Sequence, residues 1–528
     1  MKNGTMLWIS SLLLVALILI PCVQGASEET TLRIGTTNKV DSASLVGDHA
    51  LSVFGHLSNP PLMGVDEDGS VVGLIAESYE VSKDGEMWKF YIGDNLYWSD
   101  GTKVTPEDVR FTIEYLAEND KSLGWLKEAL VETSVADDGA VVIELGEPHM
   151  RLNREFTTHN ILPKHVWETI DDPEEYTNDG GYVGCGPFYI KEIDPTAGIV
   201  CFEKNPYWRG KEPSIDSVEV HIYNNRDTLS LDLMKGEVDA YYEYATTYPY
   251  ANIKTLEDTG MFDFVEWEDV GLMILGMNLQ REPISDLDFR RAVSYAIDYD
   301  EIARIIGLGY GNVPNRGLVS PSMMYFKDTD KLEYDVAKAG EILTDAGYAD
   351  SDGNGLLEGL DGEDMKLALL VRSDKPDYLR TAELVEDYLE DLGIDVDRRV
   401  VERNTWVEIK DEGEYDMTIT RTTSYGMSMW ADWGTGYIDS RKTGMGVLHT
   451  VDDPEFHQLC DDIMATTDED LLEEYGHGVQ DYYAENLPAI GLYWRKIVVP
   501  YNNAWTGWSS DPVFGIYRLD TFLNVEKA

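Results

Sequence analysis

The chain has 528 residues, of which 43% are hydrophobic and 11% aromatic, so it can form large packed cores and is not a disordered polymer. This length exceeds what one core covers, and two or three domains are expected. With 98 acidic and 42 basic residues the formal net charge is −56, which is unsuited to nucleic acid because phosphate binding needs clustered Lys and Arg. The acidic excess is better explained as a solubilising shell for a saline exterior.

The first 25 residues have the layout of a secretory signal peptide. Lys2 precedes an apolar run over residues 6–20, and small residues lie near a cleavage point after Gly25. The run is shorter than the roughly 20 residues that span a bilayer, so export is favoured over a retained anchor. Cys22 leaves lipidation open, although the proline before it fits a lipoprotein signal poorly. We therefore expect an exported, extracytoplasmic protein.

A strand and a capped helix are predicted next. Residues 88–92 alternate apolar and polar side chains, as a strand does. Thr105 and Asp108 have the spacing of a helix cap, with Pro106 at the first helical position. The apolar face of this helix is expected at Val109, Ile113 and Leu116.

Residues 184–240 predict a hairpin, a loop, a strand, a helix and a further strand. Two β-type runs, 187–193 and 198–202, flank a turn near Pro195. After the strand 218–222, the helix is expected to place Leu229, Leu231 and Leu233 on its apolar positions and to end at Gly236. Further helices are predicted over 288–300, facing inward through Phe289, Val293 and Ile297, and from 334 to near Gly347.

Cysteines are scarce and predict no metal site. A turn near Pro195 sets Cys201 opposite Ile190 and not opposite Cys185, so buried thiols are favoured over a disulfide, which stays an open alternative. There is no C-x-x-C and no zinc spacing.

One acidic loop has features of a calcium-binding site. Residues 350–361 begin like an EF-hand loop, with oxygen ligands at the first, third and fifth positions, a glycine at the sixth and Asp361 at the twelfth. The bidentate Glu and the flanking paired helices are missing, and the same residues build an ordinary tight turn. We favour the turn.

Catalytic signatures are absent from the sequence. It contains no G-x-S-x-G, H-E-x-x-H, P-loop or G-x-G-x-x-G motif, and its nine histidines are scattered singly. We expect no enzyme, no cofactor and no bound metal.

The order of these segments resembles the family 5 extracytoplasmic solute-binding proteins, the peptide and nickel receptors of ABC importers. Blocks at 88–116 and 161–167 resemble family segments, and a longer signature matches at Gly186, Pro187, Asn205, Pro206, Tyr207, Trp208, Gly210, Lys211, Pro213, Gly236, Glu237 and Asp239. The resemblance implies an α/β, two-lobed, periplasmic-binding-protein-like fold of class II (cluster C), with an additional domain and two hinge crossings.

The resemblance also implies a division of the chain. The crossings are expected near residues 271–278 and 487–494. Domain I would comprise 31–72, 182–272 and 493–528, domain II would comprise 73–181, and domain III would comprise 273–492.

The ligand is implied to lie between the lobes, against a domain III segment that starts near Tyr415. The residues expected to bind it are Arg421, Tyr425, Trp430, Asp432, Trp433, Tyr437 and Asp439. In peptide-binding relatives an aspartate here pairs with the α-amino group, a role for Asp432 or Asp439, with aromatic rings supplying sequence-tolerant contacts. An aromatic cluster that packs a core is the alternative.

A nickel-binding relative offers a rival. Residues 433–440 resemble that branch, but Ser440 stands where it has the histidine expected to touch the metal. His159 falls where relatives place a ligand-facing residue, so a metal complex stays open.

The implied function is that of a receptor that captures a small solute, best a di- or oligopeptide, and delivers it to an ABC permease. Its partners would be the permease subunits and their ATPases at the membrane surface, with no nucleic acid, and the protein would be a monomer. A nickel or metal-chelate receptor is the alternative, and a secreted enzyme is less favoured.

Overall fold

The computed structural model describes residues 29–40, 44–46, 54–67, 70–120, 123–170, 172–173, 176, 182–194, 196–244, 246–421, 438–443, 449–466, 468–511 and 514–528. The expected signal peptide and Cys22 lie outside these residues. Within them, no helix has both the length and the apolar composition that crossing a membrane requires.

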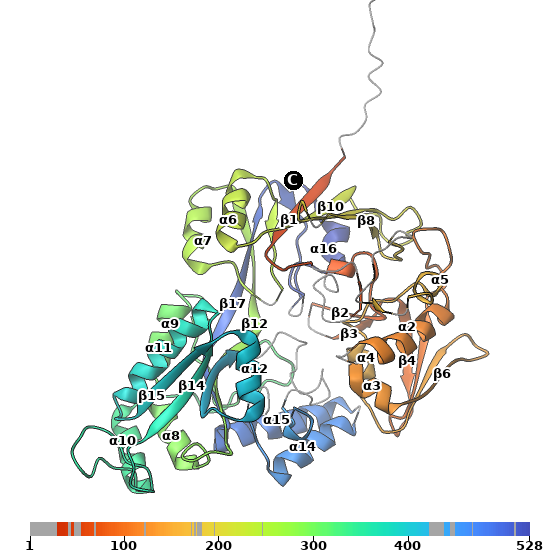
Figure 1. The fold of residues 1–528 in the computed structure, drawn as a ribbon. Helices are drawn as coiled ribbons and strands as arrows, with labels where there is room; N and C mark the ends of the chain where they lie inside the picture. The colour runs from red at the N-terminus through yellow and green to blue at the C-terminus, as the bar shows by residue number, and fades with distance from the viewer. Residues whose placement is uncertain are drawn as a thin grey trace, which may run out of the picture.

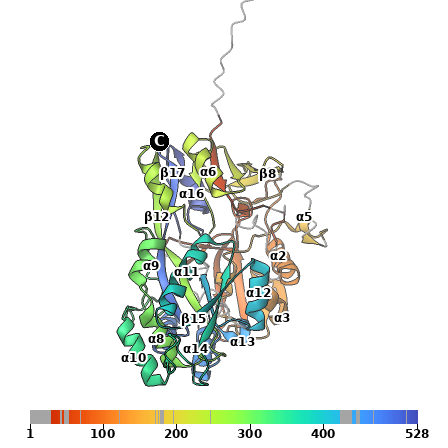
Figure 2. The ribbon, with the colours of Figure 1, turned by 60° about the vertical axis from the view of Figure 1, so that its left-hand side comes forward.

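One eleven-stranded sheet runs through both lobes (Figure 1). Its order is β15-β14-β16-β12-β17-β11-β1-β10-β9-β8, and β13 pairs with β17 beside this path. The long strands β12 (Phe262–Met277) and β17 (Ala489–Asn502) pair antiparallel from Phe262 opposite Asn502 to Gly276 opposite Ala489. Figure 2 shows both strands running from one lobe into the other. The two-lobed α/β fold predicted from the sequence is confirmed.

Lobe 1 contains the N-terminal strand and the hairpin region. Its elements are β1 (Thr31–Thr36), β8 (Phe188–Asp194), β9 (Ile199–Lys204), β10 (Ser217–Ile222), α6 (Arg226–Lys235), β11 (Ala240–Tyr241), α7 (Tyr250–Glu257), β18 (Trp505–Thr506), α16 (Leu519–Asn524) and β19 (Glu526–Lys527). Gly236 ends α6 with φ of 76°, as predicted. Leu231 was expected on the apolar face but is 51% exposed, because residues two apart on a helix point in different directions.

The hairpin corrects the expected register of the cysteines. Ile190 pairs with Phe202, and a bulge then sets Cys201 opposite Glu192. Cys201 therefore does not face Ile190, because the bulge adds a residue to β8. Cys185 and Cys201 are free thiols, as favoured from the sequence.

A separate four-stranded sheet forms a third part of the molecule, named here the four-stranded domain. Its order is β4-β5-β7-β6. Its elements are β4 (Ala76–Val81), β5 (Met87–Ile92), α2 (Pro106–Asn119), α3 (Gly124–Ala129), β6 (Leu130–Val135), β7 (Val141–Leu145), α4 (Leu152–Glu155) and α5 (Lys164–Trp167), with the ribbon of β2 (Met63–Val65) and β3 (Val71–Gly73) beside it. Thr105 and Asp108 form the predicted capping box of α2.

Lobe 2 carries most of the helices. Its elements are α8 (Leu287–Ala296), α9 (Tyr299–Ile306), β13 (Gly311–Asn312), α10 (Val336–Ala346), β14 (Lys366–Arg372), α11 (Pro376–Glu390), β15 (Asp395–Val401), α12 (Arg403–Glu412), β16 (Met417–Arg421), α13 (Ser440–Thr443), α14 (Pro454–Met464) and α15 (Glu469–Asn486). The helix expected over 288–300 is two helices, because Asp298 caps a new helix at Tyr299.

The three parts are arranged as a ring (Figure 1). Lobe 1 lies at the top, lobe 2 at the lower left, and the four-stranded domain at the right, facing α14 and α15. The exact limits of the domains expected from the sequence stay a prediction.

Two buried histidines lie in different parts of this ring. His449 is 2% exposed, and its Nε2 lies 3.0 Å from the hydroxyl of Tyr483. His56 joins lobe 1 to the four-stranded domain through the carbonyl oxygen of Thr158, 3.4 Å from its Nε2. Desolvation by burial lowers the pKa of His449 to about 3 and that of His56 to about 4.

These histidines predict a loss of stability in weak acid. The unfolded chain binds protons below pH 6.5 that the folded chain does not, so the free energy of unfolding falls as the pH falls. His449→Phe should make this dependence shallower, by about 0.7 kcal/mol per pH unit at pH 6.5 and by about 1.4 kcal/mol per pH unit near pH 5. Urea unfolding at several pH values measures it. Phe456→Leu, beside His449, is the control, because it removes packing but no titrating group and should leave the pH dependence of the unfolding free energy unchanged. The same pH dependence in the wild type and in His449→Phe would contradict the prediction.

Candidate functional site

A buried carboxylate joins three strands where the lobes meet. Asp269 of β12 lies where the pairing with β17 shifts register between Glu268 and Leu272. Its Oδ2 accepts hydrogen bonds from Arg495 Nε at 2.8 Å and from the terminal nitrogen of Arg421 at 3.0 Å. Its Oδ1 accepts the backbone N–H of Gly271 at 2.9 Å. We name Asp269, Arg421 and Arg495 the hinge network.

Charge pairing outweighs desolvation in the hinge network. The side chain of Asp269 is 2% exposed and that of Arg495 is 9% exposed. Burial alone would raise the pKa of Asp269, but the two guanidinium groups hold it below its usual range. Asp269 is therefore ionised at neutral pH, and each guanidinium keeps further donors for other groups.

Tyrosines surround the hinge network on both sides. Tyr250 of lobe 1 donates its hydroxyl hydrogen to the carbonyl of Lys496, and Tyr493 lies in β17 next to Arg495. Burial raises the pKa of both phenols, so they stay neutral. On the lobe 2 side, Tyr378 of α11 is buried near Arg421, whose charge acts on its hydroxyl.

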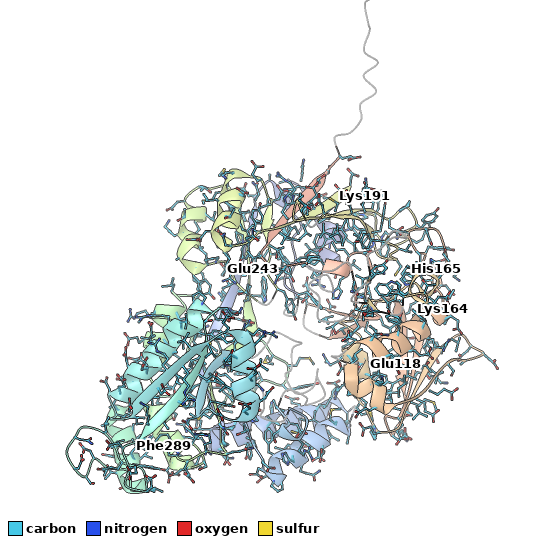
Figure 3. All side chains as sticks on the ribbon, viewed as in Figure 1. Glu118, Lys164, His165, Lys191, Glu243 and Phe289 are labelled. Atoms are coloured by element: carbon cyan, nitrogen blue, oxygen red, sulfur yellow. The ribbon has the colours of Figure 1, made fainter. Side chains whose placement is uncertain are left out.

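Charged groups of the two lobes face each other beside the hinge network. Arg226, the first residue of α6, donates to Glu243 at 2.8 Å, and Glu243 is 2% exposed at its side chain. Figure 3 shows Glu243 on the side of lobe 1 that faces lobe 2. At the start of α11, Asp377 lies near enough to Arg226 for the charges to interact, and burial lowers the pKa of Lys375. Charged side chains of both lobes thus border the junction.

The residues expected to line the ligand are only partly described. Tyr425, Trp430, Asp432, Trp433 and Tyr437 lie outside the described residues, so their roles stay predictions. Arg421 is the last residue of β16, and the structure places its guanidinium on Asp269 with 16% of its side chain exposed.

Asp439 is engaged by a neighbouring arginine. Its Oδ1 accepts Arg441 Nε at 3.0 Å, and its Oδ2 accepts a terminal nitrogen of Arg441 at 2.8 Å. Arg441 also donates to Asp461 at 2.7 Å, and these two hydrogen bonds raise the pKa of its guanidinium. The side chain of Asp439 is 1% exposed in this arrangement, and its role as an amine anchor, like that of Asp432, stays a prediction.

His159 lies inside the four-stranded domain. Its Nδ1 is 2.9 Å from the carbonyl of Glu155, and its Nε2 is 4.0 Å from a carboxylate oxygen of Asp120. Its side chain is 9% exposed, and desolvation lowers its pKa. The ring is therefore neutral and packed against the end of α2, and no described His, Cys, Asp or Glu pair completes a metal-ligand group with it.

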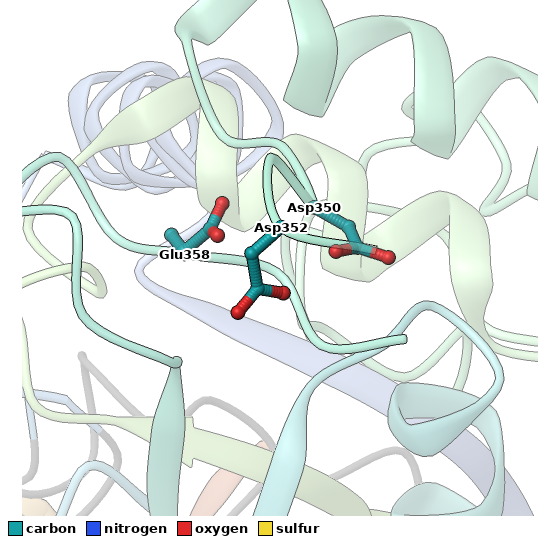
Figure 4. Close-up of side chains that lie close together, drawn as sticks. All are labelled: Asp350, Asp352 and Glu358. Carbon is teal, nitrogen blue, oxygen red and sulfur yellow. The ribbon is translucent and has the colours of Figure 1, made fainter. Parts of the chain in front are cut away.

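The acidic loop at 350–361 brings three carboxylates together (Figure 4). Asp350, Asp352 and Glu358 each place one oxygen within 4.8 Å of the others. Asp350 accepts backbone N–H groups of Gly353 and Gly355, as in a tight turn. Asp361, expected at the twelfth ligand position, instead accepts the N–H of Glu363. These hydrogen bonds are those of the turn favoured from the sequence, and the choice between a turn and a calcium site stays a prediction.

Sequence reasoning missed the other members of the hinge network. Asp269 and Arg495 are 226 positions apart, and no local pattern joins them. The one usable signal was that Arg495 directly follows the predicted crossing at 487–494, where charged side chains interrupt apolar residues on both sides.

Removing the charge of Asp269 tests the hinge network. Asp269→Asn leaves the buried Arg495 and the partly buried Arg421 without this carboxylate, and breaking a buried pair in this way costs about 3–5 kcal/mol of unfolding free energy. Asp374→Asn is the control, because its partner Arg372 is 20% and Asp374 itself 46% exposed, and such pairs contribute about 1 kcal/mol or less. Urea titration compares them, and equal midpoints for the two variants would overturn the assignment.

Two lobes joined by paired strands, with charged groups facing across the junction, define a two-lobed binding protein. Residues 70–443 match the family described as "Bacterial extracellular solute-binding proteins, family 5 Middle". The chain belongs to this family, as its signature predicted.

Two curated relatives show how far the similarity extends. The glutathione-binding protein GsiB of Salmonella typhi is 26% identical over 296 residues, 55% of this chain and 56% of that protein, so the chain matches about half the length of this relative. The oligopeptide-binding protein AppA of Bacillus subtilis is 24% identical over 94% of this chain and 90% of that protein.

Solved structures agree on the fold. AppA from Bacillus subtilis in complex with a nonapeptide has a TM-score of 0.75 at 21% identity, covering 94% of this chain and 99% of that chain. NikZ from Campylobacter jejuni in complex with Ni(L-His) has a TM-score of 0.74 at 19% identity, covering 94% of this chain and 99% of that chain. At such identities the likeness concerns the fold.

Proposed function

We propose that this protein is the extracytoplasmic receptor of an ABC importer, which captures a small solute between its lobes and delivers it to the permease. The observation that carries the proposal is the junction itself. The lobes share the strands β12 and β17, tied by the hinge network, and present charged side chains to each other. Such a junction permits hinge closure around a solute. ATP hydrolysis would belong to the transporter and not to this chain.

The solute we propose is a di- or oligopeptide. Support comes from AppA of Bacillus subtilis, which matches along 94% of this chain and whose solved structure is a complex with a nonapeptide. Peptides carry an ammonium group, and Asp432 would pair with it in a desolvated cleft, with Trp430 or Trp433 beside it. The protein would act as an exported monomer that meets its permease at the membrane surface.

The nickel alternative has less support in this chain. Ser440 lies near the carbonyl of Val451 and 3.3 Å from His457 Nε2, and it offers no imidazole of its own. His159 is packed inside the four-stranded domain. A metal chelate would need ligands other than these two positions.

Changing the two aspartates separately tests the amine anchor. Asp432→Asn should cost about 2–5 kcal/mol of affinity for a free-amine oligopeptide, because the ammonium is left poorly paired. Asp439→Asn, the matched control, should lower the unfolding midpoint and leave the affinity close to wild type, because Asp439 pairs with Arg441.

Calorimetry with the tightest peptide from a defined oligopeptide mixture, and with its N-acetylated form, measures both effects. Acetylation should weaken binding to the wild type and change little in Asp432→Asn. Wild-type affinity in both aspartate variants would show that the anchor lies elsewhere. Binding of Ni²⁺ or Ni(L-His) in place of every peptide would replace the peptide proposal.

A further inference from the structure

Helix α4 of the four-stranded domain contacts lobe 2 on the side of the ring away from the two crossing strands (Figure 1). A terminal nitrogen of Arg151, which precedes α4, donates to the carbonyl of Thr466 at 3.1 Å. A terminal nitrogen of Arg154, within α4, lies 3.4 Å from Sδ of Met324. These contacts join segments 315 and 170 positions apart, and no strand pairing joins the same two parts among the described residues.

Both arginines that make this contact are buried. Arg151 is 4% and Arg154 is 9% exposed. Arginine side chains on a surface helix are normally hydrated, and a guanidinium loses that hydration when a second surface covers it. The hydrogen bonds to lobe 2 therefore replace water that the side chains would bind with the lobes apart. Because hydrogen bonds to water are exchanged for hydrogen bonds to lobe 2, the net free energy of the contact is small. A small net free energy allows the contact to form and break reversibly.

A pocket open to solvent adjoins the contact. It has a volume of about 320 Å³ and is lined by Tyr79, Trp88 and Asn153 on one side and by Met324 and Glu469 on the other. Asn153 donates its amide hydrogen to the hydroxyl of Tyr79 at 3.0 Å, while its Oδ1 is buried without a hydrogen-bond partner. A permanent domain interface is packed like a core, whereas this contact has an open pocket and an unpaired amide oxygen beside it, as contacts between mobile domains do.

Lobe 2 presents a carboxylate, that of Glu469, near the two arginines of the four-stranded domain. Tyr325, next to Met324, donates its hydroxyl hydrogen to Glu469 at the start of α15. Burial and this carboxylate raise the pKa of Tyr325, and the positive charges of Arg151 and Arg154 act on it in the opposite direction. The arginines thus approach an acidic surface of lobe 2, in a chain whose surface is acidic overall.

We propose that α4 is a latch: Arg151 and Arg154 hold the four-stranded domain against lobe 2 and thereby favour the closed form of the receptor. The crossing strands allow the lobes to open and close, and the latch sets how long they stay closed. This role concerns lobe motion and does not depend on which solute the cleft takes.

Distances between spin labels test the latch in the full-length mature protein. Labels at Glu132→Cys in β6 and Glu473→Cys in α15 lie at exposed positions on the two sides, in a Cys201→Ser background that removes the partly exposed native thiol. The wild type should show a short distance that matches the structure and a longer one. Arg151→Ala with Arg154→Ala should lower the ratio of short to long by at least fivefold.

Two further variants keep the test decisive. Met324→Ala removes the acceptor of Arg154 from the other side and should shift the ratio in the same direction, even if the double arginine variant folds poorly. Arg110→Ala, in α2 of the same domain, removes exposed ion pairs with Glu107 and Glu114 and should leave the ratio unchanged. A ratio within twofold of wild type in both the double variant and Met324→Ala would overturn the latch. Peptide affinity, measured separately, tests the receptor function.

Discussion

The buried carboxylate of Asp269 is the constraint on which the junction of the lobes depends. It interrupts the pairing of β12 with β17 and receives guanidinium groups from β17 and β16. A charge this deeply buried persists only when it is paired, so the three strands must keep their relative register. Flexing of the sheet must then occur in the strands on either side of this point. The network thus fixes the pivot of the two lobes while leaving the lobes themselves free to approach.

Basic side chains concentrate where the parts of the molecule meet. Arg421 and Arg495 lie at the pivot, Arg226 and Lys375 on the facing edges of the lobes, and Arg151 with Arg154 at the far side of the ring. In a chain with 42 basic and 98 acidic residues, the exposed surface repels itself, and attraction has to be supplied locally. The basic side chains at these contacts therefore supply attraction between parts of a chain that is acidic overall.

Local chemistry made much of this fold predictable. The capping box at Thr105, the αL glycine at Gly236 and the alternation through Trp88 and Phe90 each depend on neighbouring residues, and the structure has all of them. Non-local geometry was not predictable. The bulge that moves Cys201 opposite Glu192 depends on packing, which residue spacing does not record. The Asp298 cap that divides one expected helix in two is a local signal, a hydrogen bond from the N–H of Glu301, that the helical period concealed. The candidate site shows the same limit, because Asp269 meets Arg421 and Arg495 across 152 and 226 positions.

The central claim is that this chain binds a solute and returns it unchanged. Native mass spectrometry of the mature protein, purified and then incubated with a defined oligopeptide mixture, tests it directly. The account predicts one intact peptide bound per chain, with the masses in the mixture unaltered after prolonged incubation. Shortened peptides in solution, or a protein that retains no peptide from the mixture, would contradict it.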